Sequence, residues 1–595
     1  MRQGMLLRIL RGLVPLWLTL VFSHDAQAAV IDDPELLLQH RLLEQQRQQQ
    51  IEQSLTRPLD PSVEDKPVKA IQLLPADQCQ TIKRIWLYGA DLLTDNTRNK
   101  INQPYIGRCL DNKDIQQLLK QYQNWYLQQG YITSRVILKY PQSSLDLGNL
   151  ELYIQEGYIS HIILADDNPF DRRLVNNSLT NRAGTILNIH DIDTGVEILN
   201  RSFAHSIQMQ IQPSDRPAHS IILLAEKRKT TQSINGDRLG RHIGRQKLSF
   251  QTSNGGSEST GETLNVATVN RDNLFGINDD IQLSATESSP NRKGEQESTN
   301  TSYRYSSHHG RWSYTASFYD GFNVRTVDGT TTAFLSSGDT KNYTLDITGL
   351  GFRNKHNKLE YKLSGKHSDK KSYINETLVE VSSRKVSTVD LGASYTRFLD
   401  SGSLLINPSL SAGMPWFGAI TDAEDIADDA PHAEYLSYKL YLSYQHSFAG
   451  KTAYPFTWQL NFNGQSSDTI LNGENNFVLG GEYSVRGYKN NILSGEHGGA
   501  LRNDFILPIG SWLDTKRKHP YWNPFNLKIY YDTGEVTTLV DQKRETLAGY
   551  GWGLSYNYRW FSVNYNRAKG LTQSEQFIAA EGWVEYYSAS INMTF

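Results

Sequence analysis

Between Thr230 and Phe595 the sequence consists of short segments in which polar and apolar residues alternate, separated by turns rich in Gly, Asn, Asp and Ser. QKLSFQTS, NYTLDITGLGF and TWQLNFNGQSS are examples. A period of two is typical of β-strands that have one wet face and one apolar face. We count about sixteen such segments from Gln246 onward, with little room for helices, and an even number of this size fits a transmembrane β-barrel.

The last segment, VEYYSASINMTF, shows the alternation most clearly. Its apolar side chains share one face and its polar side chains share the other: Tyr587, Ala589, Ile591, Met593 and Phe595 against Ser588, Ser590, Asn592 and Thr594. A soluble β-sandwich also alternates. The length of the region, the 32 tyrosines of the chain and the export signal described next favour a barrel with lipid outside and water inside.

Residues 1–28 have the form of a secretory signal peptide. Arg2, Arg8 and Arg11 precede a short apolar run, LVPLWLTLVF, which is followed by Ala26-Gln27-Ala28. The run is too short to span a bilayer as a helix, and no later apolar stretch is long enough, so we expect an exported chain without a transmembrane helix. The formal net charge of −3 shows no basic bias and argues against nucleic acid as a partner.

Only two cysteines occur, Cys79 and Cys109. In an exported chain such a pair predicts a disulfide in an oxidising compartment, not a metal site or a redox motif.

A polar helix is expected over residues 33–56, because Asp33 stands at a cap position, Pro34 follows it, and Gln, Glu and Arg fill the rest. A helix with so little apolar surface either occupies a wet cavity or lies frayed in solvent, and composition does not separate the two. Residues 57–77 hold several prolines and charges and predict an extended linker.

Two compact α/β units follow, over residues 78–157 and 158–229. In the first, KRIWLYGA predicts a strand, and the apolar residues of DNKDIQQLLKQYQNWYLQQGY recur at helical spacing. The second unit repeats the order β-α-α-β-β. Small units of this kind do not by themselves indicate a function.

A Gly-rich segment, LGGEYSVRGYKNNILSGEHGGALRNDF, carries the candidate site. It lies in a long loop, about residues 464–499, that could fold back into a wide polar barrel. We single out Val485, Arg486, Gly487 and Tyr488, because an arginine on such a loop can pair with a carboxylate of the inner wall. Asp532, in FNLKIYYDTGEV, is the candidate partner. The alternative, a solvent-facing arginine and a turn aspartate, is nearly as compatible with the spacing.

These motifs resemble those of TpsB translocators, the outer-membrane members of two-partner secretion systems. LGGEYSVRGY with LSGEHGGALRND resembles the signature loop of the family, and YYDTG resembles its second motif. INGDRLGRHIGR and NRDNLFGINDDIQL are similar to its first-strand and second-turn patterns. The resemblance implies a plug helix, a linker, two POTRA domains and a sixteen-stranded antiparallel barrel over residues 230–595. It also implies that Arg486 meets Asp532 on the barrel wall.

The resemblance further implies protein export across the outer membrane, with the POTRA domains in the periplasm. The helix would plug the pore at rest, and the POTRA domains would capture an unfolded partner exoprotein, which could be a haemolysin, an adhesin or a contact-dependent toxin. Strand addition to a POTRA sheet edge suits an unfolded client. We expect no nucleotide or other cofactor, and we expect that folding of the client outside the cell supplies the energy.

Other functions fit the sequence less well. An outer-membrane assembly (insertase) factor of the same superfamily would share the VRGY motif but lack the polar helix. A porin would lack the α/β pair, and an energy-coupled receptor would need a large globular plug. No metal-ligand spacing or catalytic set is found, and His161, His308 and His309 lack a paired acid or nucleophile at usable spacing. We therefore do not expect an enzyme.

Overall fold

The computed structural model describes residues 29–30, 73–75, 78–138, 141–142, 144–164, 169–200, 207–226, 246–289, 296–328, 332–354, 356–427, 429–448, 454–513, 524–572, 574 and 582–594. The expected signal peptide (1–28), the polar helix (33–56) and nearly all of the linker (57–77) lie outside these ranges, as does the first-strand pattern at 234–245. None of the helices among the described residues is both long and apolar enough to cross a bilayer.

The first α/β domain has a three-stranded sheet with two helices on one face. β3 (Arg84–Tyr88) is parallel and β5 (Arg135–Leu138) antiparallel to the central β6 (Asn149–Gln155). The remaining elements are α3 (Asp95–Asn102), α4 (Asn112–Gln128), η1 (Leu145–Leu147) and a small sheet of β2 (Gln80–Thr81) with β4 (Cys109–Leu110).

Helix α4 forms where its sequence begins with a cap and continues with an apolar stripe. The Asp111 carboxylate accepts a hydrogen bond from the Asp114 amide, and the Asp114 carboxylate accepts one from the Asp111 amide, which satisfies two otherwise free donors. The stripe then packs onto the sheet through Leu118, Leu119 and Tyr122, all essentially buried.

The second α/β domain repeats the plan. β7 (Tyr158–Leu164) is parallel and β8 (Ile207–Pro213) antiparallel to the central β9 (His219–Glu226). Helices α5 (Pro169–Ser178) and α6 (Ile189–Asn200) follow β7 in the chain. Its apolar core includes Ile192, Val196 and Ile222. The order β-α-α-β-β expected for both units is confirmed.

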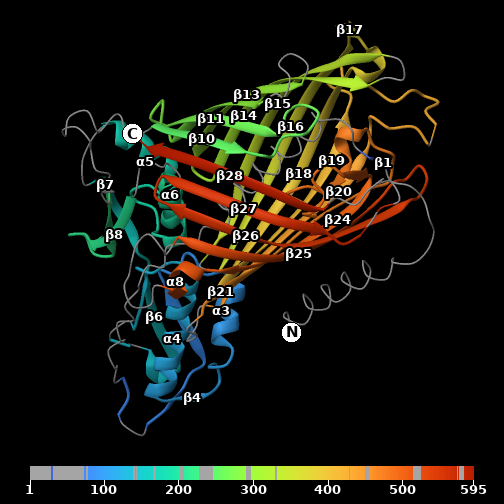
Figure 1. The fold of residues 1–595 in the computed structure, drawn as a ribbon. Coiled ribbons are helices and arrows are strands. Elements are labelled where there is room, and N and C mark those ends of the chain that lie inside the picture. The colour runs from blue at the N-terminus through green and yellow to red at the C-terminus, as the bar shows by residue number, and fades with distance from the viewer. Residues whose placement is uncertain are drawn as a thin grey trace, which may run out of the picture.

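The rest of the described chain closes into an antiparallel barrel, with the two α/β domains at one end (Figure 1). Its sixteen long strands among the described residues are β10 (Gln246–Ser253), β11 (Thr263–Asp272), β12 (Asp279–Ser289), β13 (Glu297–His309), β14 (Trp312–Asp328), β15 (Ala333–Arg353), β16 (Asn357–Ile374), β18 (Arg384–Leu399), β19 (Gly402–Met414), β20 (Leu436–Phe448), β21 (Phe456–Ser467), β24 (His497–Leu507), β25 (Phe525–Thr537), β26 (Arg544–Tyr558), β27 (Phe561–Gly570) and β28 (Trp583–Thr594). The predicted fold class, a sixteen-stranded barrel behind two α/β domains, is confirmed.

Short elements complete the barrel at its two ends. The two-residue strand β17 (Thr377–Leu378) extends the β16 edge at the end far from the α/β domains, and η2 (Glu380–Ser382) follows it. Helix α8 (Ile509–Leu513) lies at the near end, between β24 and β25.

Wall residues alternate between the lumen and the outside, as the sequence predicts. Ser590 of β28 pairs with Gln251 of β10 on one side and with Ser562 of β27 on the other, and the Ser562 and Ser590 hydroxyls lie 2.6 Å apart. Tyr587 and Ile591, on the opposite face of β28, are exposed on the outside of the ring. The two-faced pattern read from the last segment is thus present in the barrel wall.

The second α/β domain contacts the near end of the barrel through charged groups of α6. Glu197 pairs with Arg353 and lies 3.8 Å from the Lys358 ammonium, and Asp191 pairs with Arg311. The Asn278 side-chain amide also donates to the Ile198 carbonyl of α6, at 3.1 Å. This helix therefore fixes the domain to the turns that connect the wall strands.

Candidate functional site: a loop anchored inside the barrel

The segment between β21 and β24 turns back into the ring instead of leaving it. Within it, η3 (Gly473–Asn475) precedes β22 (Phe477–Leu479) and β23 (Leu493–Gly495). These two strands pair with each other, and β23 also pairs with β1 (Ala29–Val30). Both wall strands run further than the sequence suggested: Gly464 and Gly499 pair directly opposite each other, so the inward loop is 468–496 and not 464–499. Glycine at these two positions leaves room for the Phe462 ring.

Arg486 lies at the centre of this loop and is 1% exposed. Its Nε donates to Asp532 Oδ2 and its Nη2 to Asp532 Oδ1, both at 2.6 Å. The Arg486 backbone amide donates to the same carboxylate at 3.2 Å. Asp532 lies in the middle of β25 and is fully buried, so it is a wall residue and not a turn residue. The two candidate residues are thus in direct bidentate contact.

A second carboxylate and an aromatic ring complete the contacts of the guanidinium. Arg486 Nη2 also donates to Asp504 Oδ1 of β24, at 2.7 Å, and the guanidinium carbon lies 3.5 Å from the centre of the Tyr530 ring. A buried charge is costly unless its hydrogen bonds are satisfied. Two carboxylates and a π-face provide this compensation, and the planar fork of arginine suits them in a way that a lysine ammonium would not.

Glycine is required where the loop backbone touches the wall. A Cβ built on Gly549 of β26 would lie 2.0 Å from the Arg486 carbonyl oxygen. Gly487 has φ +108°, a conformation that L-residues rarely adopt, and its Cβ would lie 2.6 Å from the Gly570 amide nitrogen. Any side chain at either position would push Arg486 away from Asp532.

Tyr488 attaches the loop to the wall on the β26–β27 side. Its hydroxyl donates to the Ala548 carbonyl at 2.9 Å and accepts from the Thr572 amide at 3.0 Å. Val485 is fully buried, in an apolar cluster shared by loop and wall: Phe477, Leu479, Val485, Tyr488, Leu493, Ala500, Val536 and Leu547. The VRGY residues therefore combine one apolar contact, one ion cluster, one close backbone approach and one hydroxyl anchor.

The residues after Tyr488 reach the other side of the ring. The Lys489 ammonium lies 3.1 Å from Glu262, and the Asn490 side-chain amide donates to Glu258 at 2.9 Å. Both glutamates lie in the turn between β10 and β11, whereas Thr572 follows β27. The loop thus spans the junction between β28 and β10, where the ring closes.

The other residues singled out in the sequence lie away from this site. Cys79 and Cys109 form a disulfide in the first α/β domain. His161 is an exposed residue of β7, with Nδ1 2.8 Å from its neighbour Ser160. His309 contacts Asn177 of α5 at the near end of the barrel, and His308 Nδ1 lies 2.7 Å from the Ser313 hydroxyl. Within the described ranges, no group of three or more metal-binding side chains is found.

Sequence reasoning missed Asp504, Tyr488's partner Thr572 and the two glutamates that meet Lys489 and Asn490. Asp504 stands two residues after Arg502 on the same face of a strand, so two charges point into the lumen together. That spacing could have identified it. The partners of Tyr488 and Lys489 lie in loops far along the chain and leave no local signal.

Comparison with known proteins places this architecture in a family. Residues 241–556 match the family model described as haemolysin secretion/activation protein ShlB/FhaC/HecB. Residues 80–157 match a POTRA domain of ShlB type, and residues 158–213 match a POTRA domain.

Individual proteins agree with this match. The chain is 30% identical over 468 residues to the outer membrane transporter CdiB of Dickeya dadantii, covering 78% of each chain. It is 28% identical over 501 residues to the hemolysin transporter protein ShlB of Serratia marcescens, covering 82% of each. The solved structure of CdiB from Escherichia coli has the same fold, with a TM-score of 0.80 at 24% identity, over 95% of this chain and all of that one.

The matched barrel, the two POTRA domains and the relatives identify the chain as a member of the ShlB/FhaC/HecB family of outer-membrane TpsB transporters, with its POTRA domains in the periplasm.

Proposed function

We propose that this protein secretes a large partner exoprotein across the outer membrane and that loop 468–496 is the gate of its pore. The observation that carries the proposal is Arg486, buried on two carboxylates inside a barrel whose wall otherwise presents polar side chains. Membership of the family supports export as the activity, because two relatives of this chain are named as an outer membrane transporter (CdiB) and a hemolysin transporter protein (ShlB).

The site assigns a role to each residue of the motif. Arg486 anchors the loop, and the carboxylates of Asp532 and Asp504 accept its hydrogen bonds. Gly487 allows the loop backbone to lie against the wall, and Tyr488 and Val485 fix the tip. A loop held by a few directional polar contacts can be released when water or a client group replaces those contacts, while the hydrogen bonds of the wall stay intact.

The POTRA domains are suited to receive an unfolded client. Each sheet has two outer strands with one neighbour apiece among the described residues: β3 and β5 in the first domain, β7 and β8 in the second. An extended peptide can add to such an edge through backbone hydrogen bonds. Folding of the client outside the cell would prevent its return and supply the driving force without ATP. The expected polar helix at 33–56 would occlude the pore at rest.

The gate is tested by exchanging Arg486 for alanine and measuring the partner protein in the culture medium. We expect secretion to be lost while the barrel stays folded in the outer membrane, as judged by its heat-dependent gel mobility. The matched control is Arg544→Ala, which removes an arginine paired with the partly exposed Glu535 in the neighbouring wall strands. Normal export by the Arg486 variant would refute the role of the loop.

The plug is tested separately by deleting residues 33–56 and recording single-channel conductance in planar bilayers. We expect a higher conductance. An unchanged value would show that this segment does not occlude the pore.

A further inference from the structure

A row of alternating charges crosses the barrel wall from β14 to β18. Asp320 pairs in register with Lys341, Lys341 with Asp369, and Asp369 with Lys385. The Lys385 ammonium lies 3.7 Å from Asp369. We call these four residues the charged ladder.

The charged ladder faces the outside of the barrel. Arg384, the residue before Lys385, points into the lumen, where its Nε and Nη2 donate to Glu474 of the inward loop at 2.9 and 2.8 Å. Side chains alternate along a strand, so Lys385 faces outward, and the pairing register carries the same face to Asp369, Lys341 and Asp320. Lys385 is accordingly 47% exposed.

Aromatic rings place the ladder relative to the bilayer. The neighbouring outward row, one step closer to the periplasm, is Tyr303, Phe318, Tyr343 and His367, with successive ring centres 6.0, 5.0 and 6.4 Å apart. Aromatic belts mark the edges of the lipid-facing band. On the periplasmic side of Tyr343, the outward residues of β15 are apolar, Leu345 and Ile347. The lipid-facing band therefore ends between Tyr343 and Lys341.

The length of β15 gives the same placement. This strand ends at Arg353, which contacts the POTRA domain at the periplasmic end. Twelve residues separate Arg353 from Lys341, which is about 30 Å along the membrane normal for a strand tilted by about 40°. That distance matches the thickness of a hydrocarbon core, so Lys341, Asp369 and Lys385 lie at the level of the outer-leaflet headgroups.

The charges fill two adjacent outward rows on this side of the barrel. One further step outward, Asp339 pairs in register with Lys371, so three lysines alternate with three aspartates over β14, β15, β16 and β18. On β20 the outward residues Leu436, Tyr438, Leu440 and Leu442 carry no charge over the same face of the strand.

We propose that the outer wall of β14–β18 binds the phosphorylated headgroup of the outer-leaflet glycolipid, with Lys341, Lys371 and Lys385 on its phosphates. Ammonium groups pair with phosphate oxygens, and aspartates bind the divalent cations that neutralise neighbouring phosphates. The alternation of the two signs matches a lattice of phosphates and cations, whereas a purely basic patch would suit a free polyanion.

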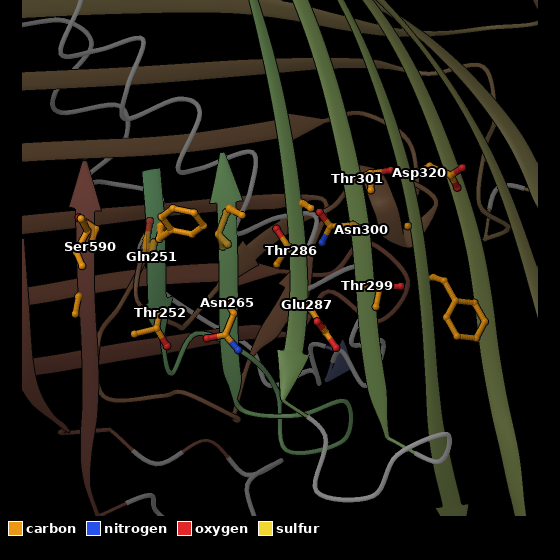
Figure 2. A pocket seen from close by; sticks show the side chains of 18 of the residues that line it. Gln251, Thr252, Asn265, Thr286, Glu287, Thr299, Asn300, Thr301, Asp320 and Ser590 are labelled. Atoms are coloured by element: carbon orange, nitrogen blue, oxygen red, sulfur yellow. The ribbon is translucent and has the colours of Figure 1, made fainter. Parts of the chain in front are cut away.

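The wall beside the ladder has room for the rest of such a lipid. A groove of about 780 Å³ lies along β10–β14 and β27–β28, and Asp320 is part of its lining. Figure 2 shows Asp320 at one side of it, next to Thr301 on the neighbouring strand. Its lining also includes Phe250 and Ile591, whose outward apolar side chains suit an acyl chain that continues from the headgroup towards the middle of the bilayer.

The test uses the purified full chain in phosphatidylethanolamine vesicles, with or without bisphosphorylated lipid A. The readout is the temperature at which the barrel loses its folded gel mobility, as a function of lipid A content. We expect lipid A to raise this temperature in the wild type. In the variant K341Q/K371Q/K385Q, we expect an about tenfold weaker apparent affinity, because each exposed ion pair contributes modestly.

Matched controls make the result specific. The variant K113Q/K120Q changes two exposed lysines of the POTRA helix α4 and is expected to respond like the wild type. Equal mobility of all variants without lipid A shows that the barrel folds. If the triple variant misfolds, the single variants K341Q and K385Q take its place. The proposal is overturned if the lysine variants keep the full response, or if dephosphorylated lipid A or phosphatidylglycerol gives the same shift as lipid A.

Discussion

The first POTRA domain and the loop inside the barrel are both buried, but the loop adds a buried ion cluster to its apolar contacts. The first POTRA domain packs around apolar side chains such as Leu118, Leu119 and Tyr122. In the loop, the largest fully buried side chain is an arginine. An apolar core is non-directional and is lost only when the domain unfolds. A polar anchor depends on a few directed bonds, and water can replace them.

This difference separates stability from gating. The strands of the wall hydrogen-bond to one another all round the ring. Arg486, Tyr488 and Lys489 contact that wall through side chains and single backbone groups, beside the apolar cluster that the loop shares with it. Releasing the loop should therefore cost a few interactions and leave the ring closed. Single substitutions in the loop and in the POTRA domains should separate the two, from the largest effect to the smallest.

Replacing Asp532 by alanine should release the loop. Arg486 would remain buried without its main acceptor, and breaking one side of a buried ion pair typically costs about 3–5 kcal/mol. We expect loop residues to become accessible to external protease in intact cells, with unchanged barrel mobility on gels. The control is Glu535→Gln, a partly exposed carboxylate of the same strand. A loop that stays protected in the Asp532 variant would mean that the apolar cluster alone holds it.

Replacing Leu118 by alanine should have the converse effect. The residue is fully buried in α4, and deleting a core leucine side chain costs about 3–5 kcal/mol. We expect hydrogen exchange to accelerate throughout the first POTRA domain and to stay unchanged in the barrel and its loop. Gln117→Ala, at the exposed neighbouring position, is the control. Faster exchange in the loop would show that the two regions are coupled.

Tyr488→Phe should loosen the loop tip without releasing it. The hydroxyl bridges the Ala548 carbonyl and the Thr572 amide, and losing buried hydrogen bonds of this kind costs about 1–2 kcal/mol. We expect amides of the loop to exchange about 5- to 30-fold faster. Tyr438→Phe, on the outward face of β20, should leave these rates unchanged. Equal rates in both variants would exclude the hydroxyl as an anchor.

The smallest effect concerns pH and the junction between the two POTRA domains. Burial lowers the pKa of His190, at the start of α6, and Arg353 lowers it further while Asp191 opposes the shift. As pH falls below the ordinary value of about 6.5, the unfolded chain takes up a proton that the folded domain resists. Stability of this domain should therefore decrease on acidification.

Urea unfolding of the second POTRA domain at several pH values checks this expectation. His190→Gln should flatten the dependence below pH 6.5 or so, whereas His161→Gln, on the exposed face of β7, should not. A slope that survives in the His190 variant would assign the pH dependence to other groups.

Much of the fold could be predicted because its periods are local. Alternation at two positions marks wall strands such as β28, and apolar spacing at three and four marks α4. The extent of the loop was wrong for a physical reason. Gly464 and Gly499 suggest turns, but in the wall they face each other beneath the ring of Phe462, and glycine paired with a neighbouring aromatic is compatible with a strand.

The partners within the site were harder to predict. Arg486 and Asp532 are 46 positions apart, and Arg486 and Asp504 are 18 apart. Their contact depends on how β24 and β25 are aligned, and on a loop that folds inward, neither of which is a local property of the sequence. The motif singled out Arg486, whereas the second carboxylate emerges only from the register of the two strands.

The closure of the ring has a consequence for how the protein is made. At the junction of β10 and β28, the Tyr587 amide donates a hydrogen bond to the Asn254 side chain, although the two residues are 333 positions apart. Bringing such distant residues together is entropically costly and belongs late in assembly. Until then, the two end strands have unpaired backbone edges that invite wrong partners. A nascent molecule should therefore need escort from synthesis until its last hairpin docks, and premature termination should yield an aggregation-prone open sheet.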